Sequence, residues 1–451
     1  MSQEKILKAG FAKVCINPPF GAPILGYYKP RFVKGVLDNL YARAVVFANG
    51  EKSVAIVTLD LAEVPKFIYD AMRSEISKTT GMDVEGVFIN CSHTHTGPVV
   101  GKDFASDKKS TDTYNDFLVT SAVSAVSFAL DNMKACHLES ATAQAKNISF
   151  VRRFRMKDGS VATNPGVNNP DILHALDTPN ETVTLLKVVR DGAKDIFMVN
   201  FGTHPDSVGG EYISADYMGF VCDILEKAVP DIDCMFLLGP QGDVNHVNVH
   251  PTKGESAISE IDFDSVPRSI KHAEHMGRVI AGAVLSVCSI TEKVDGTEIA
   301  YVNKMVDLPS NQENDKLEES KRIYKLYEEG RESELPFKEM ALTTAIARAK
   351  RIISLENGPE SFPFLLSAIK VGGAVFAGVG GEPFSEIGRR INAVSPFDVT
   401  VLCCLTNNAG GYIPTTKAYD EGGYEAGNSA LKPGGDDIIV NAMQDVFEQI
   451  K

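Results

Sequence analysis

The chain has 451 residues, of which 44% are hydrophobic and 23% charged, and its 45 lysines and arginines against 59 aspartates and glutamates give a net charge of −14. This balance is typical of a globular protein and excludes a largely disordered or fibrous chain. The acidic excess argues against a nucleic-acid partner and against docking on anionic lipid, because both depend on clustered lysine and arginine. We expect a single domain over residues 1–451, since no internal repeat or low-complexity linker divides the chain.

The first residues, MSQEKILKAGFAKV, contain no apolar stretch of signal-peptide length, and no run approaches the ~18 apolar residues of a membrane helix. The eight cysteines include no C-x-x-C pair. Several lie in apolar runs, such as residues 234–238 and 399–405, which is typical of reduced and buried thiols. We therefore expect a cytoplasmic protein.

Short apolar runs alternate with helical patterns along most of the chain. Strands are predicted over residues 53–59, 86–90, 195–201, 234–238, 375–379 and 399–405. Helices are predicted over residues 64–78 and 114–132. This alternation predicts an α/β fold in which helices cover a largely buried sheet.

Residues 311–357 differ from this pattern, because they are rich in Glu, Lys and Arg and read as two amphipathic helices. The first is predicted over residues 318–329 and to end at Gly330, and the second to run from Pro336 to about Leu355. One stripe of the first helix is apolar: Ile323, Leu326 and Tyr327. The pattern favours a charged helical excursion on the surface over a catalytic domain, and it leaves open whether the segment acts as a lid.

Side chains able to do chemistry collect directly after five of the predicted strands. The strand exits read SHTHTGP, GTHPD, GPQGDVNH, GGEP and TNNAGGY, and each carries His, Asp, Glu or Tyr, most of them among glycines. In sheets of this kind ligands bind at the carboxyl ends of strands, and glycine lets the backbone approach a ligand closely. The five exits together predict one shared site.

Four side chains at these exits suit a metal ion. His93 and His95 are two residues apart, so on an extended segment both imidazoles point to one face. Spacing alone does not separate metal binding from two rings that donate to backbone carbonyls. His204 and Glu382 favour the metal, because two neutral imidazoles and one carboxylate form a common catalytic zinc site with an open position.

These segments resemble the signatures of the neutral/alkaline non-lysosomal ceramidase family, specifically of its catalytic N-terminal domain. The similar segments are SHTHTGP, FGTHPDS, QGDVN, GEPFSEIGRR and NNAGGYIPTTKAYDEGGYEAGNS, in the order of the family. The resemblance extends from GFAKVCINPPFGAPILGY near the start to about Asn428. It implies mixed β-sheets layered with helices in an αββα arrangement, and a zinc-dependent amidase. It also implies a short, cytoplasmic, bacterial-type member without the family's signal peptide and C-terminal immunoglobulin-like domain.

The resemblance assigns roles to individual residues. The implied zinc ligands are His93, His204, Glu382 and Tyr412. His95 would face the substrate, Tyr424 matches a second tyrosine of the family's site, and Arg152 matches the arginine of an Asn-Arg motif, with Arg153 as the alternative. Asp243 is a candidate for orienting one of these groups, or else a turn residue that caps the following segment. Purely structural roles are the alternatives for two of these residues. Tyr412 would then be a buried tyrosine beside a glycine turn, and Arg152 a surface arginine of a basic strand.

Two departures from the family bear on the substrate. The family's G-D-V-S-P-N segment reads GDVNHV here, and its Asn-Arg motif reads Val151-Arg152. A serine, a proline and an amide side chain near the substrate are therefore missing. The residues expected to line the substrate pocket are Asn245, His246 and Gly97, with a plain loop role as the alternative for His246.

The implied chemistry follows from charge. Zinc lowers the pKa of bound water from ~15.7 to about 7, which supplies a nucleophile for an amide or ester carbonyl at neutral pH. His95, Tyr424 and Arg152 are expected to donate to the developing oxyanion. His95 or a pocket carboxylate would pass a proton to the leaving amine.

Three functions remain open. The first is a zinc amidase that acts on a small soluble N-acyl compound, lactam or ester, with a true ceramidase acting on N-acylsphingosine as its alternative within the family. The second is an amidohydrolase barrel, where H-x-H also follows a strand, although Glu382 and Tyr412 fit it poorly. The third is a non-catalytic protein that retains a metal or ligand pocket. The expected partner is a small-molecule substrate and the expected cofactor is Zn²⁺, whereas nothing indicates an oligomeric state.

Overall fold

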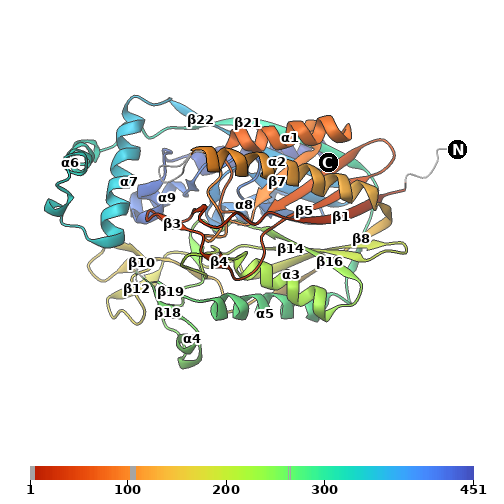
Figure 1. Cartoon of the computed structure of the whole chain (residues 1–451), viewed down its shortest axis with the longest axis horizontal. Helices are drawn as coiled ribbons and strands as arrows, with labels where there is room; N and C mark the ends of the chain where they lie inside the picture. Colours follow the sequence, from red (N-terminus) through yellow and green to blue (C-terminus); the bar gives the residue numbers. More distant parts are fainter. Residues whose placement is uncertain (1–5, 102–107, 263, 265) are drawn as a thin grey trace.

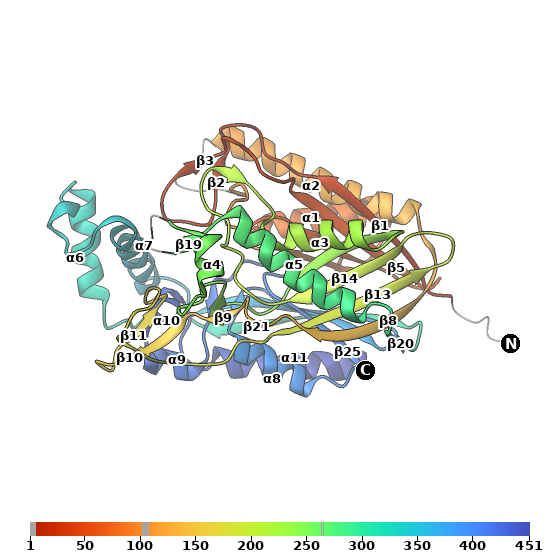
Figure 2. The same ribbon diagram turned by 90° about the horizontal axis from the view of Figure 1, so that it is seen from below.

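The computed structural model describes residues 6–101, 108–262, 264 and 266–451. Two β-sheets lie face to face, and helices cover the outer face of each sheet (Figure 1, Figure 2). The α/β class and the αββα layering expected from the sequence are confirmed. The single-domain organisation expected over residues 1–451 stays a prediction.

Within the described residues, the larger sheet has nine strands in the order β16-β14-β13-β8-β1-β5-β6-β7, with β20 paired to β8. Its strands are β1 (Lys8–Cys15), β5 (Tyr41–Ala48), β6 (Ser53–Leu59), β7 (Val87–Cys91), β8 (Lys134–Gln144), β13 (Thr182–Arg190), β14 (Asp195–Phe201), β16 (Ile232–Leu238) and β20 (Glu292–Val294). The pairs β6–β7 and β14–β16 are parallel, and the other pairs are antiparallel.

The smaller sheet has the order β21-β22-β23-β25. Its strands are β21 (Ile299–Pro309), β22 (Ser361–Val371), β23 (Ala374–Val379) and β25 (Val399–Cys403). The pair β23–β25 is parallel. The carboxyl ends of β7, β14, β16, β23 and β25 therefore carry the five polar segments that follow the predicted strands.

Helices complete the outer layers. The larger sheet is covered by α1 (Lys66–Thr80), α2 (Lys108–Asp131), α3 (Asp216–Ala228) and α5 (Ile270–Val287), and the smaller sheet by α8 (Ser385–Val394) and α11 (Gly435–Ile450) (Figure 2). Short elements connect these layers: β2 (Pro23–Ile24), β3 (Arg31–Phe32), β4 (Gly35–Val36), η1 (Val84–Gly86), β9 (Phe150–Val151), β10 (Arg153–Met156), β11 (Val161–Thr163), β12 (Ile172–Ala175), β15 (Tyr212–Ile213), β17 (Val244–Asn245), α4 (Lys253–Ala257), β18 (Glu260–Ile261), β19 (Pro267–Arg268), β24 (Glu382–Pro383), β26 (Tyr412–Ile413), α9 (Thr416–Glu421) and α10 (Tyr424–Asn428).

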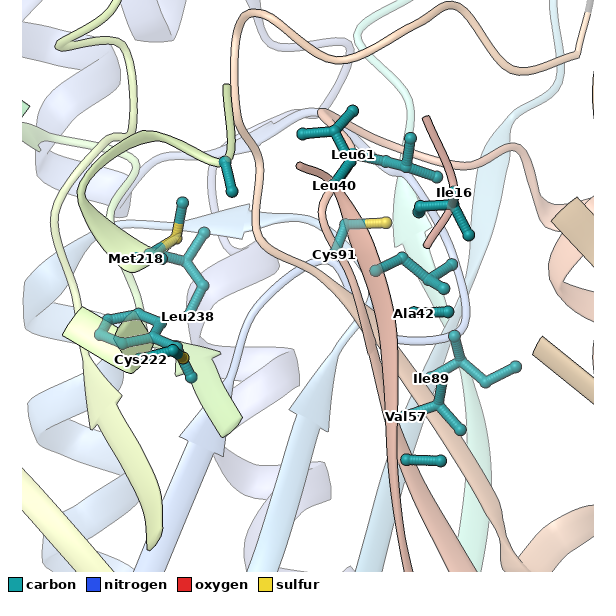
Figure 3. Close-up of a cluster of buried hydrophobic side chains, with 14 of the residues drawn as sticks. Ile16, Leu40, Ala42, Val57, Leu61, Ile89, Cys91, Met218, Cys222 and Leu238 are labelled. Atoms are coloured by element: carbon teal, nitrogen blue, oxygen red, sulfur yellow. The ribbon is translucent and has the colours of Figure 1, made fainter. Parts of the chain in front are cut away.

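The strands of the larger sheet are buried on both faces, as the alternation in β6 shows. Ile56 packs between the two sheets, whereas its neighbour Val57 packs under the helices, because successive strand side chains point to opposite faces. Figure 3 shows part of the cluster under the helices, with Val57 near Ile89 and Ala42. Complete burial of a valine or isoleucine side chain contributes about 1.5–3 kcal/mol, so these two interfaces stabilise the packing of the layers.

Most predicted elements are present with small shifts at their ends. The strands predicted over residues 53–59 and 195–201 have the observed bounds of β6 and β14. The strand predicted over residues 399–405 ends earlier, at Cys403. There the chain leaves the smaller sheet, and the Cys404 amide donates to Leu238 O at 3.0 Å, which ties the exit of β25 to the exit of β16.

The charged segment forms a hairpin of two helices, α6 (Leu317–Glu328) and α7 (Glu339–Glu356), with the 3-10 turn η2 (Glu332–Glu334) between them; it lies at one end of the molecule (Figure 1). The predicted start at Pro336 is wrong, because the chain stays non-helical while Leu335 and Phe337 pack into a small core of the hairpin. The predicted stripe is wrong at Tyr327, which is 47% exposed, and Tyr324 packs in its place.

No helix in the described ranges is long and apolar enough to cross a membrane. All eight cysteines are free, and five of them are buried: Cys91, Cys222, Cys234, Cys403 and Cys404. The reduced state expected from the sequence is consistent with this arrangement.

Candidate metal centre

Three histidines meet beyond the ends of β7 and β14. His93 and His95 follow β7, and His204 follows β14. The Nε2 atom of His95 lies 3.4 Å from that of His93 and 3.0 Å from that of His204. One ring nitrogen from each residue lies within 4.8 Å of the others, so the three side chains could hold a metal ion.

Glu382 and Tyr412 reach the same place from the side of the smaller sheet. They stand opposite each other in the parallel pair β24–β26. Glu382 Oε2 lies 3.2 Å from His93 Nε2 and 3.8 Å from His204 Nδ1. The Tyr412 ring stacks on the His204 ring with centroids 6.5 Å apart. The four residues that the family resemblance assigns to zinc are thus brought together, and His95 lies among them.

His93 is held in an unusual backbone conformation. Its φ of 63° is in the left-handed region, which costs a non-glycine residue about 1–3 kcal/mol. The surroundings hold it there, because the His93 amide donates to Leu61 O at 2.8 Å. The Nδ1–H of the ring donates to Ala62 O at 2.6 Å. When the ring is neutral, that bond leaves the lone pair on Nε2, which lies 3.4 Å from His95 Nε2 and 3.2 Å from Glu382 Oε2.

Gln241 orients His204 in the same way. Its Nε2 donates to Glu382 Oε2 at 3.1 Å, which fixes the amide so that Oε1 faces and contacts His204 Nδ1. Since Oε1 can only accept, the proton of His204 is on Nδ1 and the lone pair is on Nε2. Sequence reasoning missed Gln241, although its position in the GPQGD strand exit was a signal.

Burial dominates the electrostatics of the site. It lowers the pKa of His95 and of His204 well below the usual range, and the charges of neighbouring groups, His93 and Arg152 respectively, lower them further. For His93, burial also lowers the pKa, but Glu382 outweighs it and raises the pKa. His95 and His204 are therefore neutral near pH 7, the form in which imidazole binds a metal.

Arg152 lies beside Tyr412 in a buried network. Its Nε is 2.7 Å from Glu425 Oε1, and the two side chains are 5% and 0% exposed. Its guanidinium lies 5.3 Å from the centre of the Tyr412 ring. Arg153 instead donates to Gly422 O at 2.9 Å, away from the site. The geometry thus favours Arg152 over Arg153, and Glu425 was missed because nothing in the sequence marks it.

Asp243 does not face the histidines. Its Oδ1 accepts from the amide and the hydroxyl of Ser385, at 2.7 and 2.8 Å, where α8 begins. Burial raises the pKa of Asp243 to about 6. The preceding Gly242 is needed for close approach, because a Cβ atom there would be 2.5 Å from Glu382 O. Asp243 therefore caps α8 and supports the loop that carries Glu382, and its placement next to a catalytic donor is not observed.

A cavity of about 1030 Å³ adjoins the histidines. The three histidines, Glu382 and Tyr412 line it, as do the predicted Arg152 and Tyr424. The Tyr424 ring lies 5.9 Å from the Tyr412 ring. The helical hairpin α6–α7 contributes another part of the lining: Ile323, Phe337, Ala345, Arg348, Arg351 and Ile352. The charged segment thus forms a wall of the site.

Two residues predicted for the substrate pocket are not among the described residues that line this cavity. Gly97 O accepts from the Leu25 amide at 3.0 Å. Asn245 donates to Asn164 Oδ1 at 3.0 Å, and only Asn164 lines the cavity. These backbone and amide contacts give both residues a supporting position behind the wall.

His246, the third predicted pocket residue, also lies behind the lining. Its Nδ1 is 3.0 Å from Asp206 Oδ1, and its Nε2 donates to Pro267 O at 2.8 Å. Arg268 approaches the other oxygen of Asp206 at 3.2 Å and packs over the ring of Tyr27 at 4.9 Å. Sequence reasoning did not identify Asp206, Arg268 or Tyr27, all of which line the cavity.

We predict that Gln241→Ala weakens zinc binding about 10- to 100-fold, because the mutation removes the acceptor that fixes His204 and a donor to Glu382. Competition with a chromogenic chelator measures the affinity. Gln144→Ala is the matched control, because Gln144 is exposed at the end of β8. Its side-chain amide donates a hydrogen bond to the hydroxyl of Thr182 in β13. Equal zinc affinity for Gln241→Ala and the unmutated protein would contradict the orienting role.

Comparisons with known proteins identify a family and a similar fold. The family model described as "Neutral/alkaline non-lysosomal ceramidase, N-terminal" matches residues 10–239. The crystal structure of neutral ceramidase from Pseudomonas aeruginosa is similar, with a TM-score of 0.73 and 17% identity, over 99% of this chain and 75% of that chain. A structure of a ceramidase complexed with C2 is also similar, with a TM-score of 0.72 and 15% identity over the same shares. A search of curated proteins finds no match.

Proposed function

The chain belongs to the neutral/alkaline non-lysosomal ceramidase family, and on this premise we propose that it is a zinc-dependent hydrolase that cleaves the amide bond of a small soluble substrate, or a related lactam or ester. The observation that carries the proposal is the convergence of His93, His204 and Glu382 at one end of a cavity of about 1030 Å³. The free cysteines support a cytoplasmic location within the same proposal.

The proposed zinc ligands are His93, His204, Glu382 and Tyr412. The hydrogen bonds at both Nδ1 atoms support the two histidines, because they leave the Nε2 lone pairs for the ion. Two imidazoles and one carboxylate are a common ligand set of catalytic zinc sites, and Tyr412 adds a further oxygen donor. When bound, zinc acidifies water and polarises a carbonyl oxygen.

The other polar groups of the cavity supply the remaining chemistry. Arg152 and Tyr424 lie on either side of Tyr412, where they can donate to an oxyanion that develops on the carbonyl. His95 is proposed to carry the proton to the leaving nitrogen. In support, the Nε2–H of His95 can donate to the lone pair of His204 Nε2 at 3.0 Å. The buried Nδ1 of His95 has no hydrogen-bond partner among the described residues and is then free to accept a proton.

We predict that His95→Asn lowers kcat/KM about 10²- to 10³-fold while the protein keeps one zinc per chain. We expect this result because His95 is proposed to transfer the proton, whereas the four proposed ligands, which do not include His95, retain the ion. Metal analysis and kinetics on the same sample measure both quantities, with His250→Asn, at an exposed loop position, as the control. A His95→Asn protein that loses its zinc would make His95 a metal ligand and contradict the assignment.

A substrate panel tests the function itself. Zinc-loaded protein is assayed with short acyl amides, lactams, esters and long-chain ceramide. We expect turnover of soluble amides that disappears after chelation and in His93→Ala. Turnover of ceramide alone would contradict the proposal of a soluble substrate, but it would still support a hydrolase. Absence of both zinc binding and turnover would contradict the hydrolase and favour a non-catalytic binding protein.

A further inference from the structure

We propose that the cavity binds an amide that carries a carboxylate group, and that Arg348 of α7 binds this carboxylate while the amide lies at the histidines; this narrows the substrate class of the proposed amidase and rests on that function. The chemistry of the cavity wall leads to this conclusion in three steps: the pairing of its charges, the placement of Arg348, and the continuity of the wall with the metal centre.

Near the histidines, each arginine that lines the cavity is paired with a carboxylate. The charged residues of this part of the lining are Glu63, Arg152, Asp206, Asp264, Arg268 and Glu382. Arg152 is paired with Glu425 at 2.7 Å. Arg268 is paired with the two aspartates, at 3.2 and 2.5 Å. Glu382 is occupied by His93 at 3.2 Å. Each arginine at this end therefore already has a carboxylate partner within the protein.

The charges on the hairpin are not balanced. Lys316, Arg348 and Arg351 line the cavity there, together with the single acid Glu319. Within the described part of the chain, none of these three cations has a carboxylate within 4.0 Å. Glu319 also lies farther away than this from each of them. Arg351 uses neutral partners, Asn428 Oδ1 at 2.8 Å and the Tyr28 hydroxyl at 3.3 Å. A net positive charge therefore faces the cavity at this end.

Arg348 is the best placed of these cations to bind an anion. Its guanidinium packs closely on α10, since a Cβ atom on Gly427 would be 3.0 Å from Cζ and 3.1–3.2 Å from the two terminal nitrogens. Its Nε is buried and has no hydrogen-bond partner among the described residues. A partly desolvated arginine without an acid is costly, and a carboxylate offers its planar fork two parallel hydrogen bonds.

Aromatic contacts connect Arg348 with the metal centre along one wall. Tyr424 begins α10, the helix against which the Arg348 guanidinium packs at Gly427. The Tyr424 ring lies 5.9 Å from the Tyr412 ring, which in turn lies 6.5 Å from the ring of His204. Arg348 and the three histidines therefore line one continuous cavity. An uncharged lipid amide would cover Arg348 without pairing it, whereas a carboxylate would neutralise it.

Matched ligands test the inference on the full-length, zinc-loaded protein. One pair is N-acetyl-L-phenylalanine and N-acetylphenethylamine, and the other is N-phenethylsuccinamic acid and N-phenethylbutanamide; the first member of each carries a carboxylate and the second lacks it. We expect calorimetry to show that the acid of at least one pair binds about 10- to 100-fold more tightly than its neutral partner. Absence of a preference in both pairs would overturn the inference.

Variants separate Arg348 from the metal as the source of the preference. Arg348→Gln is expected to abolish it, Arg348→Lys to keep part of it, and Gly427→Ala to weaken it by crowding the guanidinium without removing its charge. Arg322→Gln, on the exposed side of α6, is the matched control and keeps the full preference. An undiminished preference in Arg348→Gln would overturn the inference, because the carboxylate would then bind elsewhere.

Hydrolysis in the same samples distinguishes this inference from the proposed function. Equal binding and turnover of acids and neutral amides would overturn the carboxylate site and leave the amidase. A binding preference that depends on Arg348, without hydrolysis of any amide, lactam or ester, would support the carboxylate site and contradict the amidase.

Discussion

Replacing His204 with alanine is expected to remove the bound zinc and to lower amide hydrolysis by roughly 10³-fold or more. The side chain supplies one of the two imidazoles whose Nε2 lone pairs are set free by hydrogen bonds at Nδ1, and Gln241 orients it from behind. Without the ion, the pKa of water returns from about 7 toward ~15.7, so the nucleophile nearly disappears at neutral pH. Metal analysis and steady-state kinetics of the purified variant measure the two effects.

A second variant guards against simple unfolding as the cause. His174→Ala, at an exposed position of β12, should retain both zinc and activity. Circular dichroism should show the same secondary structure for both variants, because His204 follows a strand end and does not contribute to the cores between the layers. A His204→Ala protein that keeps one zinc per chain and its activity would contradict the metal assignment.

Replacing Glu425 with glutamine is expected to lower the free energy of unfolding by about 3–5 kcal/mol, because it leaves the buried Arg152 guanidinium without a carboxylate. Glu425 is 2.7 Å from Arg152 and 3.8 Å from Arg153, and it also accepts from Thr163 at 2.9 Å. Its side chain is fully buried. Urea unfolding followed by circular dichroism measures the change.

The matched control is an exposed Arg–Glu pair on the helical hairpin. Glu334 lies 2.7 Å from Arg331, but both side chains are more than half exposed. Water and salt screen such pairs, so Glu334→Gln should leave the free energy of unfolding essentially unchanged. If Glu425→Gln were as stable as Glu334→Gln, the buried network around Arg152 would not contribute to stability as described.

The sequence predicted the fold best where burial is strongest. β6 and β14 have apolar side chains on nearly every position and were predicted with their observed bounds. The second helix of the hairpin was predicted less well, because the rule that places proline at a helix start competes with packing. Leu335 and Phe337 pack into the hairpin's own core, and the helix begins only at Glu339. Sequence patterns do not show which local signal such tertiary contacts override.

Some residues of the candidate site could likewise be predicted from the sequence, and others could not. Residues at strand exits, such as His93 and Glu382, could be identified because topology brings the carboxyl ends of strands together. Glu425 and Arg348 could not be identified, because their roles depend on contacts with residues more than 70 positions away in sequence. Glu425 pairs with Arg152, and Arg348 packs on Gly427 without a carboxylate partner. Asp243 shows the converse, because a residue in a chemically suggestive motif instead caps α8.

Anomalous diffraction at the zinc absorption edge, from crystals of the purified protein, tests the metal assignment most directly. We expect one strong peak at bonding distance, about 2.0–2.2 Å, from Nε2 of His93 and His204 and from the Glu382 carboxylate, with the Tyr412 oxygen as a further ligand and one position open for water. The absence of a peak between these side chains, or a peak bound by other residues, would contradict the account.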